Sequence, residues 1–245
     1  MAEHSNKRVA LVTGANKGIG YETARQLAGQ GITVLLGARD EQRGREAAAK
    51  LQGEGLDARF LPLDLSDRET HQAARRFIEA NFGRLDILIN NAGVALDVAQ
   101  KPSEVDLDTL RRTFDTNFFG AVSVTQALLP LIRKSGAGRI VNVSSGLGSL
   151  TRHGDPGWEF YPVKPLAYNA SKTALNAFTV MLAHELRETA VKVNSADPGF
   201  TATDMTGHQG YKTVEQGAAV ITQLATLPAD GATGGYFDDQ GVLPW

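Results

Sequence analysis

The sequence predicts a single-domain α/β protein with a Rossmann-like, doubly wound parallel sheet and helices on both faces. Three observations support this fold class. Short apolar runs alternate with longer segments of helical period, which is the pattern of parallel strands joined by crossover helices. A glycine-rich turn follows the first apolar run and precedes the first helical segment. The length of 245 residues suits one open α/β domain, so we expect residues 1–245 to form a single unit.

The first half of the chain is expected to supply four strands and three helices. The strands are predicted at Val9 to Val12, Ile32 to Leu36, Arg59 to Leu65 and Leu85 to Ile89. The helices are predicted at Tyr21 to Gln30, from an Asp40 cap to Gln52, and from a capping box at Ser66-Asp67-Arg68-Glu69 to Ala80.

The second half continues the alternation with one interruption. A cap at Ser103-x-x-Asp106 opens a long helical region through Phe114, Phe118 and Val122, which Pro130 is expected to kink or end. Later strands are predicted at Ile140 to Val143, Val191 to Ser195 and Gly235 to Phe237, with helices at Tyr168 to Glu188 and Glu215 to Leu224. Between residues 146 and 166, glycine, proline and aromatic residues predict a loop.

Composition disfavours several classes of function. The net charge is −2 and basic residues are scattered, so nucleic acid is not an expected partner. Cysteine is absent, which excludes disulfides and thiolate metal sites. We expect no metal site, because the histidines lack ligand spacing. They are His4, His71, His153, His184 and His208. No apolar stretch approaches ~18 residues, and the first apolar run, broken by Thr13-Gly14, is too short for the hydrophobic region of a signal peptide. A cytoplasmic protein without membrane association is therefore expected.

The glycine-rich turn from Thr13 to Gly20 is the first candidate binding site. Backbone N–H groups at the start of a helix, together with the helix dipole, suit a pyrophosphate. Glycines matter there because a Cβ would hold the backbone away from the ligand or prevent the turn. The residues concerned are Gly14, Asn16, Lys17, Gly18, Ile19 and Gly20. The alternative is a tight turn that binds nothing.

Arg39 lies nineteen residues after Gly20, where dinucleotide folds often place an acid on the ribose. A guanidinium there can hold a 2′-phosphate through two parallel hydrogen bonds, and Lys17 adds a second cation. The sequence therefore favours NADP(H) over NAD(H). The alternatives are that both cations are merely solvated, or that Asp40 binds a ribose.

Tyr168 and Lys172 are four residues apart, which places both on one face of a helix and indicates proton chemistry. A neighbouring ammonium favours the phenolate, so we expect it to lower the pKa of the phenol. The pattern alone is common on ordinary helices. It becomes informative because a glycine-rich turn opens the chain and Ser144-Ser145 closes a strand upstream.

In these motifs the chain resembles the classical short-chain dehydrogenase/reductase family over almost its whole length. The matching elements are Thr13 to Gly20, Asp64, Asn90-Asn91-Ala92-Gly93, Asn117, Ser145, Tyr168-x-x-x-Lys172 and Pro198-Gly199. Further details are most similar to NADPH-dependent carbonyl reductases. They are Asn16 to Gly20, Ala38-Arg39-Asp40, Thr116 to Gly120 and Trp245. The resemblance places the cofactor-binding motifs mainly in residues 7–93 and the catalytic and substrate region mainly in residues 110–215.

The resemblance implies a catalytic role for four residues. Tyr168 would be the general acid that protonates a carbonyl oxygen as hydride arrives, and the general base in reverse. Ser145 would hydrogen-bond the same oxygen. Lys172 would lower the tyrosine pKa and hold the nicotinamide ribose. Asn117 would position a water that connects Lys172 to solvent.

The resemblance also distributes the cofactor contacts. It assigns Asp64 and Leu65 to the adenine and Asn91, Ala92 and Gly93 to its ribose side. It assigns Pro198, Gly199, Thr201 and Thr203 to the nicotinamide end. Each has a structural alternative: residues 90–93 could be a strand-ending turn, and Asn117 could be a polar bridge between two backbones.

Two departures from the family pattern are visible. Tyr168 lies 23 positions after Ser145, a longer spacing than the family usually has. Asp197 precedes Pro198-Gly199, where a small or neutral residue is usual. The longer loop leaves assembly open, and a monomer is favoured over a homo-oligomer.

The substrate is expected to be a small-molecule carbonyl compound that is bulky or aromatic. We expect residues 146–166 and 200–209 to enclose it, because aromatic residues gather in this loop. The predicted walls are Trp158, Phe160, Tyr161, Phe200 and Met205. A hydrophobic plug on the protein's own surface is the structural alternative. The rival functions are an NAD-linked alcohol dehydrogenase and a non-catalytic dinucleotide-binding regulatory protein.

Overall fold

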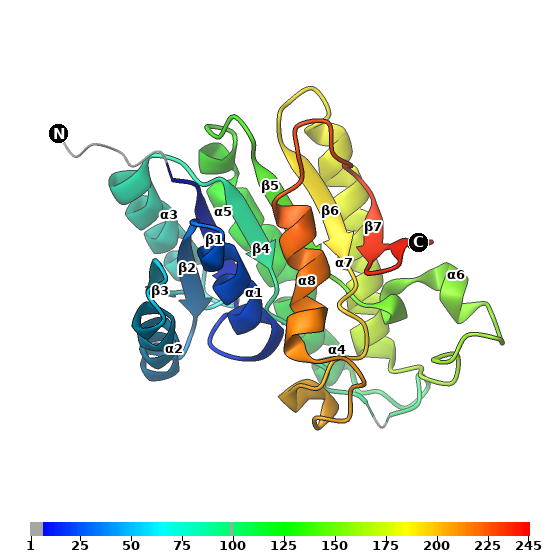
Figure 1. Ribbon diagram of the computed structural model, residues 1–245. Coiled ribbons are helices and arrows are strands. Elements are labelled where there is room, and N and C mark those ends of the chain that lie inside the picture. Colours follow the sequence, from blue (N-terminus) through cyan, green and yellow to red (C-terminus); the bar gives the residue numbers. More distant parts are fainter. Residues whose placement is uncertain (1–6, 99) are drawn as a thin grey trace.

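The computed structural model describes residues 7–98 and 100–245, which form one eight-stranded sheet with helices on both faces (Figure 1). The strand order is β3-β2-β1-β4-β5-β6-β7-β8, and neighbours are parallel except β7 and β8. The strands are β1 (Val9–Thr13), β2 (Thr33–Ala38), β3 (Ala58–Pro62), β4 (Ile87–Asn90), β5 (Arg139–Val143), β6 (Lys192–Ala196), β7 (Tyr236–Asp238) and β8 (Gly241–Val242). The predicted fold class is confirmed.

Six helices cover the two faces of the sheet. One face carries α1 (Gly18–Gly29), α2 (Glu41–Gly53) and α8 (Val214–Ala225), and the other carries α3 (Arg68–Phe82), α5 (Ala121–Ile132) and α7 (Leu166–Glu185). Two shorter helices are α4 (Leu107–Phe114), which packs against α7, and α6 (Leu150–His153). No helix within residues 7–98 and 100–245 is long and apolar enough to cross a membrane.

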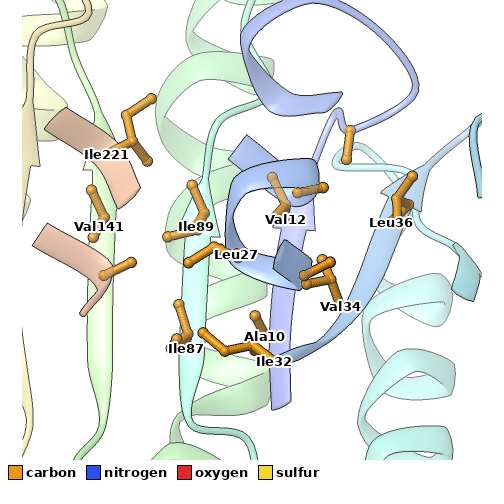
Figure 2. Packing of buried hydrophobic residues seen from close by; sticks show 14 of the residues in the cluster. Ala10, Val12, Leu27, Ile32, Val34, Leu36, Ile87, Ile89, Val141 and Ile221 are labelled. Atoms are coloured by element: carbon orange, nitrogen blue, oxygen red, sulfur yellow. The ribbon is translucent and has the colours of Figure 1, made fainter. Parts of the chain in front are cut away.

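The two hydrophobic cores share the central strands because successive side chains of a strand point to opposite faces. In β1, Ala10 and Val12 pack with Leu27 of α1 in one core, as Figure 2 shows, whereas Val9 and Leu11 belong to the other. Every residue of β1 is therefore buried. Strands covered on both faces read as continuous apolar runs, which is why the sequence marks them so clearly.

Strand β1 has β2 on one side and β4 on the other, and the order of the strands reverses between them. The β1–β4 junction is therefore a topological switch point. Ligands of open α/β sheets bind outside the carboxyl ends of the strands at such a point. Here the Thr13 hydroxyl accepts hydrogen bonds from the backbone N–H groups of Asn91 and Ala92, at 2.9 and 3.0 Å. The two predicted cofactor segments are thus joined directly.

Several element boundaries differ from the predictions. Asp67, not Ser66, caps α3 by accepting from the Glu69 amide, because the Ser66 hydroxyl donates to Asp64 instead. Asp106, not Ser103, caps α4.

Further differences lie in the second half. Pro130 lies inside α5, which continues to Ile132. The predicted loop holds α6 and a short 3₁₀ turn at Gly146–Gly148, and β8 was not predicted. α7 begins two residues earlier than predicted and ends at Glu185.

A π-helical turn at Asp115–Gly120 joins α4 to α5 and carries Asn117. Such turns are rare in proteins, and those that occur are often found at functional sites. Gly120 lets this turn approach the chain after β3, since a Cβ on Gly120 would lie 2.7 Å from the Leu65 Cβ and 3.0 Å from its carbonyl oxygen.

Gly120→Ala is expected to lower the free energy of unfolding by about 1–3 kcal/mol, because the Leu65 backbone cannot easily move aside. Urea unfolding measures the change. The control is Gly29→Ala at the end of α1, where an added Cβ has nothing within 4 Å. A Gly120→Ala variant as stable as Gly29→Ala would show that the close approach does not constrain the turn.

Candidate active site

Tyr168 lies in the first turn of α7, and a carboxylate from a distant loop fixes the start of that helix. Buried Asp97 accepts hydrogen bonds from the backbone N–H groups of Ala167 (2.6 Å) and Tyr168 (3.3 Å). Pro165, at the N-cap position, has no side-chain acceptor to offer, so Asp97 performs the capping. Sequence reasoning missed Asp97, because a cap about seventy residues away leaves no local signal.

Burial raises the pKa of the Tyr168 phenol to about 12. A hydrogen bond with the Ser145 side chain opposes this shift of the pKa, and the charge of Asp197 adds to it. The phenol pKa is therefore raised rather than lowered in this structure, in which desolvation is the largest effect, and the lowering expected from Lys172 remains a prediction. The phenol is protonated at neutral pH, as a proton donor must be.

Lys172 is buried beneath the tyrosine, with Nζ 5.7 Å from the Tyr168 ring centroid. Nζ donates a hydrogen bond to the Val143 carbonyl at 2.8 Å, at the end of β5. Burial lowers the pKa of Lys172 to about 8. Gly93 leaves room for this ammonium, because a Cβ there would lie 3.4 Å from Nζ and 3.3 Å from Asn117 Oδ1.

Asn117 ties the loop after β4 to α7. Its Oδ1 accepts from the Val94 amide at 2.8 Å, and its Nδ2 donates to the Val94 carbonyl and to Ser171 Oγ, both at 2.9 Å. The side chain thus acts as the bridge that the structural alternative described, next to Lys172. The water relay remains a prediction.

Ser145 follows β5 and is held on two sides. Its Oγ accepts a hydrogen bond from the Leu147 amide at 3.2 Å, and its carbonyl accepts one from the Tyr236 hydroxyl. The preceding Ser144 amide donates to the Ala196 carbonyl of β6 at 2.7 Å. Ser145 therefore has a fixed place at the carboxyl edge of the sheet.

The glycine turn is shaped by contact with the segment after β4. Gly14 has φ +64°, and a Cβ there would lie 3.0 Å from Ala92. A Cβ on Gly20 would lie 2.3 Å from Asn91 Nδ2, which donates to the Thr13 carbonyl at 2.9 Å. Asn91 and Ala92 thus pack against the glycine turn and stabilise it. Their predicted contacts with the cofactor ribose remain predictions.

The turn has the features that a dinucleotide phosphate needs. Lys17 occupies the N-cap position of α1, where its ammonium can only donate hydrogen bonds, and its Nζ pairs with Asp204 at 2.5 Å. No side chain caps the helix, so the first-turn amides can bind another acceptor. Gly18, at φ +57°, lies across from Thr203, whose Cγ2 would be 3.7 Å from an added Cβ. The glycine turn and the segment after β6 therefore face each other.

The cations expected to hold a 2′-phosphate lie at the same edge of the sheet. Arg39 is exposed directly after β2, and its charge contributes to the lowered pKa of Asp64, which hydrogen bonds from Ser66 lower most. Asp40 is occupied as the N-cap of α2, accepting from the Arg43 amide at 2.9 Å. Because Asp40 already caps α2, it is a weaker candidate for binding a ribose. The hydrogen-bond donors Arg39 and Lys17 fit a phosphate better than a ribose hydroxyl.

Other predicted cofactor residues have structural contacts of their own. Ile19 packs on the first core and Leu65 on the second. The Thr201 hydroxyl donates to the carbonyls of Pro198 and Gly199, both at 3.2 Å. Asn16 is half-buried in the glycine turn. Their cofactor contacts remain predictions.

Asp197, the departure noted in the sequence, is buried at the end of β6. Its Oδ1 accepts from the Gly199 amide at 2.9 Å, and its Oδ2 lies 3.7 Å from Arg152 Nη1 of α6. Burial raises the pKa of this carboxyl, and hydrogen bonds from the backbone of Gly199 and Gly146 and the charge of Arg152 oppose the shift.

Aromatic rings form a continuous chain from the predicted substrate loop to the segment after β6. Consecutive ring centroids are 5.4 to 5.9 Å apart, in edge-to-face arrangements. The members are His153, Trp158, Phe160, Phe200 and Tyr211. The chain brings the two predicted segments together.

Two of the predicted wall residues lie outside this chain. Tyr161 is exposed beneath Lys164, and Met205 is exposed. Sequence reasoning missed Tyr211, which enters because the segment after β6 folds back through the Thr201–Lys212 bridge.

The geometry gathers a protonated phenol, a serine hydroxyl and a buried ammonium at the edge of the sheet that the glycine turn also reaches. These groups can donate a proton to an oxygen and stabilise charge on it. Among the described residues, no group of three or more His, Asp or Glu side chains could hold a metal ion.

Comparisons with known proteins identify the family. The model of the short chain dehydrogenase family matches residues 8–213. Carbonyl reductase [NADPH] 1 of Mus musculus is 35% identical, with 98% of this chain and 99% of that protein covered. The short-chain dehydrogenase anuI of Penicillium roqueforti is 40% identical, with coverage of 97% and 96%.

A solved structure of similar fold is the NADPH-bound carbonyl reductase from chicken fatty liver. It superposes with a TM-score of 0.85 at 27% identity, covering 98% of this chain and 99% of that one. The family resemblance predicted from the motifs is thereby confirmed, and the chain belongs to the short chain dehydrogenase family.

Proposed function

We propose that the protein is an NADPH-dependent oxidoreductase that reduces a ketone or aldehyde carbonyl to an alcohol, with Tyr168 as general acid. The observation that carries the proposal is the half-buried Tyr168 phenol, hydrogen-bonded to Ser145 and lying above the buried Lys172 ammonium. Relatives named as NADPH-dependent carbonyl reductases, one solved with NADPH bound, support both the cofactor and the reaction.

Each of the candidate catalytic residues has a separate role in carbonyl reduction. When bound, the reduced nicotinamide supplies the hydride. Tyr168 donates its proton to the carbonyl oxygen, and the Ser145 hydroxyl hydrogen-bonds that oxygen as negative charge builds on it. The Lys172 ammonium then stabilises the phenolate that remains, because opposite charges attract strongly in a buried site.

The choice of cofactor rests on Arg39 and Lys17. Arg39 would hold the 2′-phosphate by paired hydrogen bonds, and Lys17 would exchange its exposed partner Asp204 for the phosphate. That exchange costs little, since exposed ion pairs contribute about 0–1 kcal/mol.

The aromatic chain favours a bulky or aromatic carbonyl substrate. Trp158 and Phe160 come from the loop between Ser145 and Tyr168, and Phe200 follows the Pro198-Gly199 turn, so the chain joins the two segments expected to enclose the substrate. A cytoplasmic monomer remains our proposal for the state of the protein.

Tyr168→Phe is expected to lower kcat at least about 100-fold, because the proton donor is removed while the ring is kept. NADPH oxidation against a panel of ketones and aldehydes gives the rate, and NADPH fluorescence gives the Kd, which should not change. Tyr161→Phe, an exposed tyrosine of the same region, should retain wild-type turnover. Wild-type kcat in Tyr168→Phe would refute the proposed acid.

Arg39→Asp is expected to lower kcat/KM for NADPH by about 10- to 100-fold, since a charged hydrogen bond contributes about 1.5–3 kcal/mol. The value for NADH should stay constant or rise. Arg76→Asp, on an exposed position of α3, makes the same change of charge away from the site. If the NADPH to NADH ratio were equal in Arg39→Asp and wild type, Arg39 would not read the 2′-phosphate.

Trp158→Ala and Phe160→Ala are each expected to raise KM about tenfold for bulky aromatic ketones, because lost apolar contact weakens binding by about 1–3 kcal/mol. Small aliphatic aldehydes serve as the internal comparison and should be little affected. Tyr161→Ala, in the same loop but outside the aromatic chain, is the matched control. Equal KM values for all three variants and the wild type would indicate that the chain is only a surface plug.

A further inference from the structure

The carboxylate of Asp197 lies where three segments of the candidate site meet. It follows β6 and accepts the Gly199 amide, which fixes the Pro198-Gly199 turn at φ +73°. The backbone of Gly146, the residue after Ser145, also hydrogen-bonds to it. Its third partner is Arg152 of α6, which belongs to the loop that carries Trp158.

Gly146 shows how closely these segments are packed. A Cβ at this position would lie 2.9 Å from Asp197 Oδ2, 3.0 Å from Arg152 Nη1 and 3.4 Å from the Trp158 ring. The turn after Ser145, the carboxylate and the guanidinium therefore meet with no room for a further side chain.

Arg152 extends the contact to the last strands and to the aromatic chain. Its Nη2 lies 3.4 Å from Asp238 Oδ2 of β7, and its guanidinium lies 5.8 Å from the Trp158 ring centroid. The Asp197 amide donates to the Phe237 carbonyl at 2.7 Å, and the Thr151 amide donates to the Trp245 carbonyl at 3.0 Å. α6 is thus anchored to β7 and to the C-terminus.

We propose that Asp197 and Arg152 form a positioning pair that holds Ser145, the Pro198-Gly199 turn and the Trp158 loop in the arrangement needed for hydride and proton transfer. This inference rests on the proposed function. The negative charge is needed for Arg152, because the Gly199 amide bonds to Oδ1, an oxygen that an Asn side chain would also offer. A buried carboxylate is tolerated only when it is paired, and Arg152 supplies the pairing.

The first arm of the test is independent of turnover. In a Trp245→Phe background, Trp158 is the only tryptophan, since the chain has two. Asp197→Asn is expected to increase acrylamide quenching of Trp158 fluorescence, because Arg152 keeps only the Asp238 carboxylate as a charged partner and α6 is held less tightly. Glu185→Gln, which removes the carboxylate of an exposed ion pair at the far end of α7, is the matched control and should leave quenching unchanged.

The second arm measures catalysis on a ketone that the wild type reduces. Asp197→Asn is expected to lower kcat about 10- to 100-fold, as small misplacements of reacting groups do, with the Kd for NADPH nearly unchanged. The primary deuterium isotope effect with deuterated NADPH should rise, because hydride transfer becomes more rate-limiting. Arg152→Met should behave alike, and Asp197→Asn/Arg152→Met should be no slower than the slower single variant.

The outcomes separate this inference from the proposed function. A wild type that reduces no carbonyl compound would refute the proposed function, while Trp158 quenching would still decide whether the pair holds the loop. If Asp197→Asn showed wild-type quenching, the pair would not hold the Trp158 loop. If quenching changed but kcat and the isotope effect stayed at wild-type values, the pair would not position the reacting groups. If thermal melting shows that Asp197→Asn does not fold, Arg152→Met decides by the same readouts.

Discussion

The hydrogen bond from the Lys172 ammonium to the Val143 carbonyl is the constraint on which the candidate site depends. It ties α7, which carries Tyr168, to the end of β5, two residues before Ser145. A buried ammonium needs close partners, and glycines in two neighbouring segments let the chain pack closely around Lys172. A Cβ on Gly148 would lie 3.0 Å from the Lys172 Cβ, and one on Gly93 would lie 3.4 Å from Nζ. The spacing of the acid and the serine is thus set by backbone contacts.

The same edge of the sheet is supported from within by a buried polar network. Asn90 Nδ2 donates to Asn142 Oδ1 at 2.8 Å, Asn142 Nδ2 donates to Thr179 Oγ1 at 2.8 Å, and Thr179 shares a 2.8 Å hydrogen bond with Ser195. These side chains come from β4, β5, α7 and β6, the elements that place the site. These hydrogen bonds join the four elements and complement the apolar packing on either face, although Asn90 Oδ1 has no partner among the described residues.

Much of the fold was predictable because strands buried on both faces leave apolar runs and helices leave a period of 3.6. The glycine turn, Ser145, Tyr168 and Lys172 were predictable because motifs on successive carboxyl ends of parallel strands meet at one edge. Sequence spacing could not reveal Asp97 or Arg152, which act across 70 and 45 residues. Nor could it give the sign of the Tyr168 pKa shift, since an i,i+4 spacing shows a neighbour but not the depth of burial.

Burial acts on the two titrating groups of the site in the same sense, because it opposes charge on each. It raises the pKa of Tyr168 to about 12 and lowers that of Lys172 to about 8. The phenolate that forms when Tyr168 gives up its proton would be costly anywhere else in this interior. Beside Lys172 it meets an opposite charge in a medium of low dielectric, where attraction is strong. The phenol therefore holds its proton until an acceptor arrives, and the ammonium lowers the cost of releasing it at that moment.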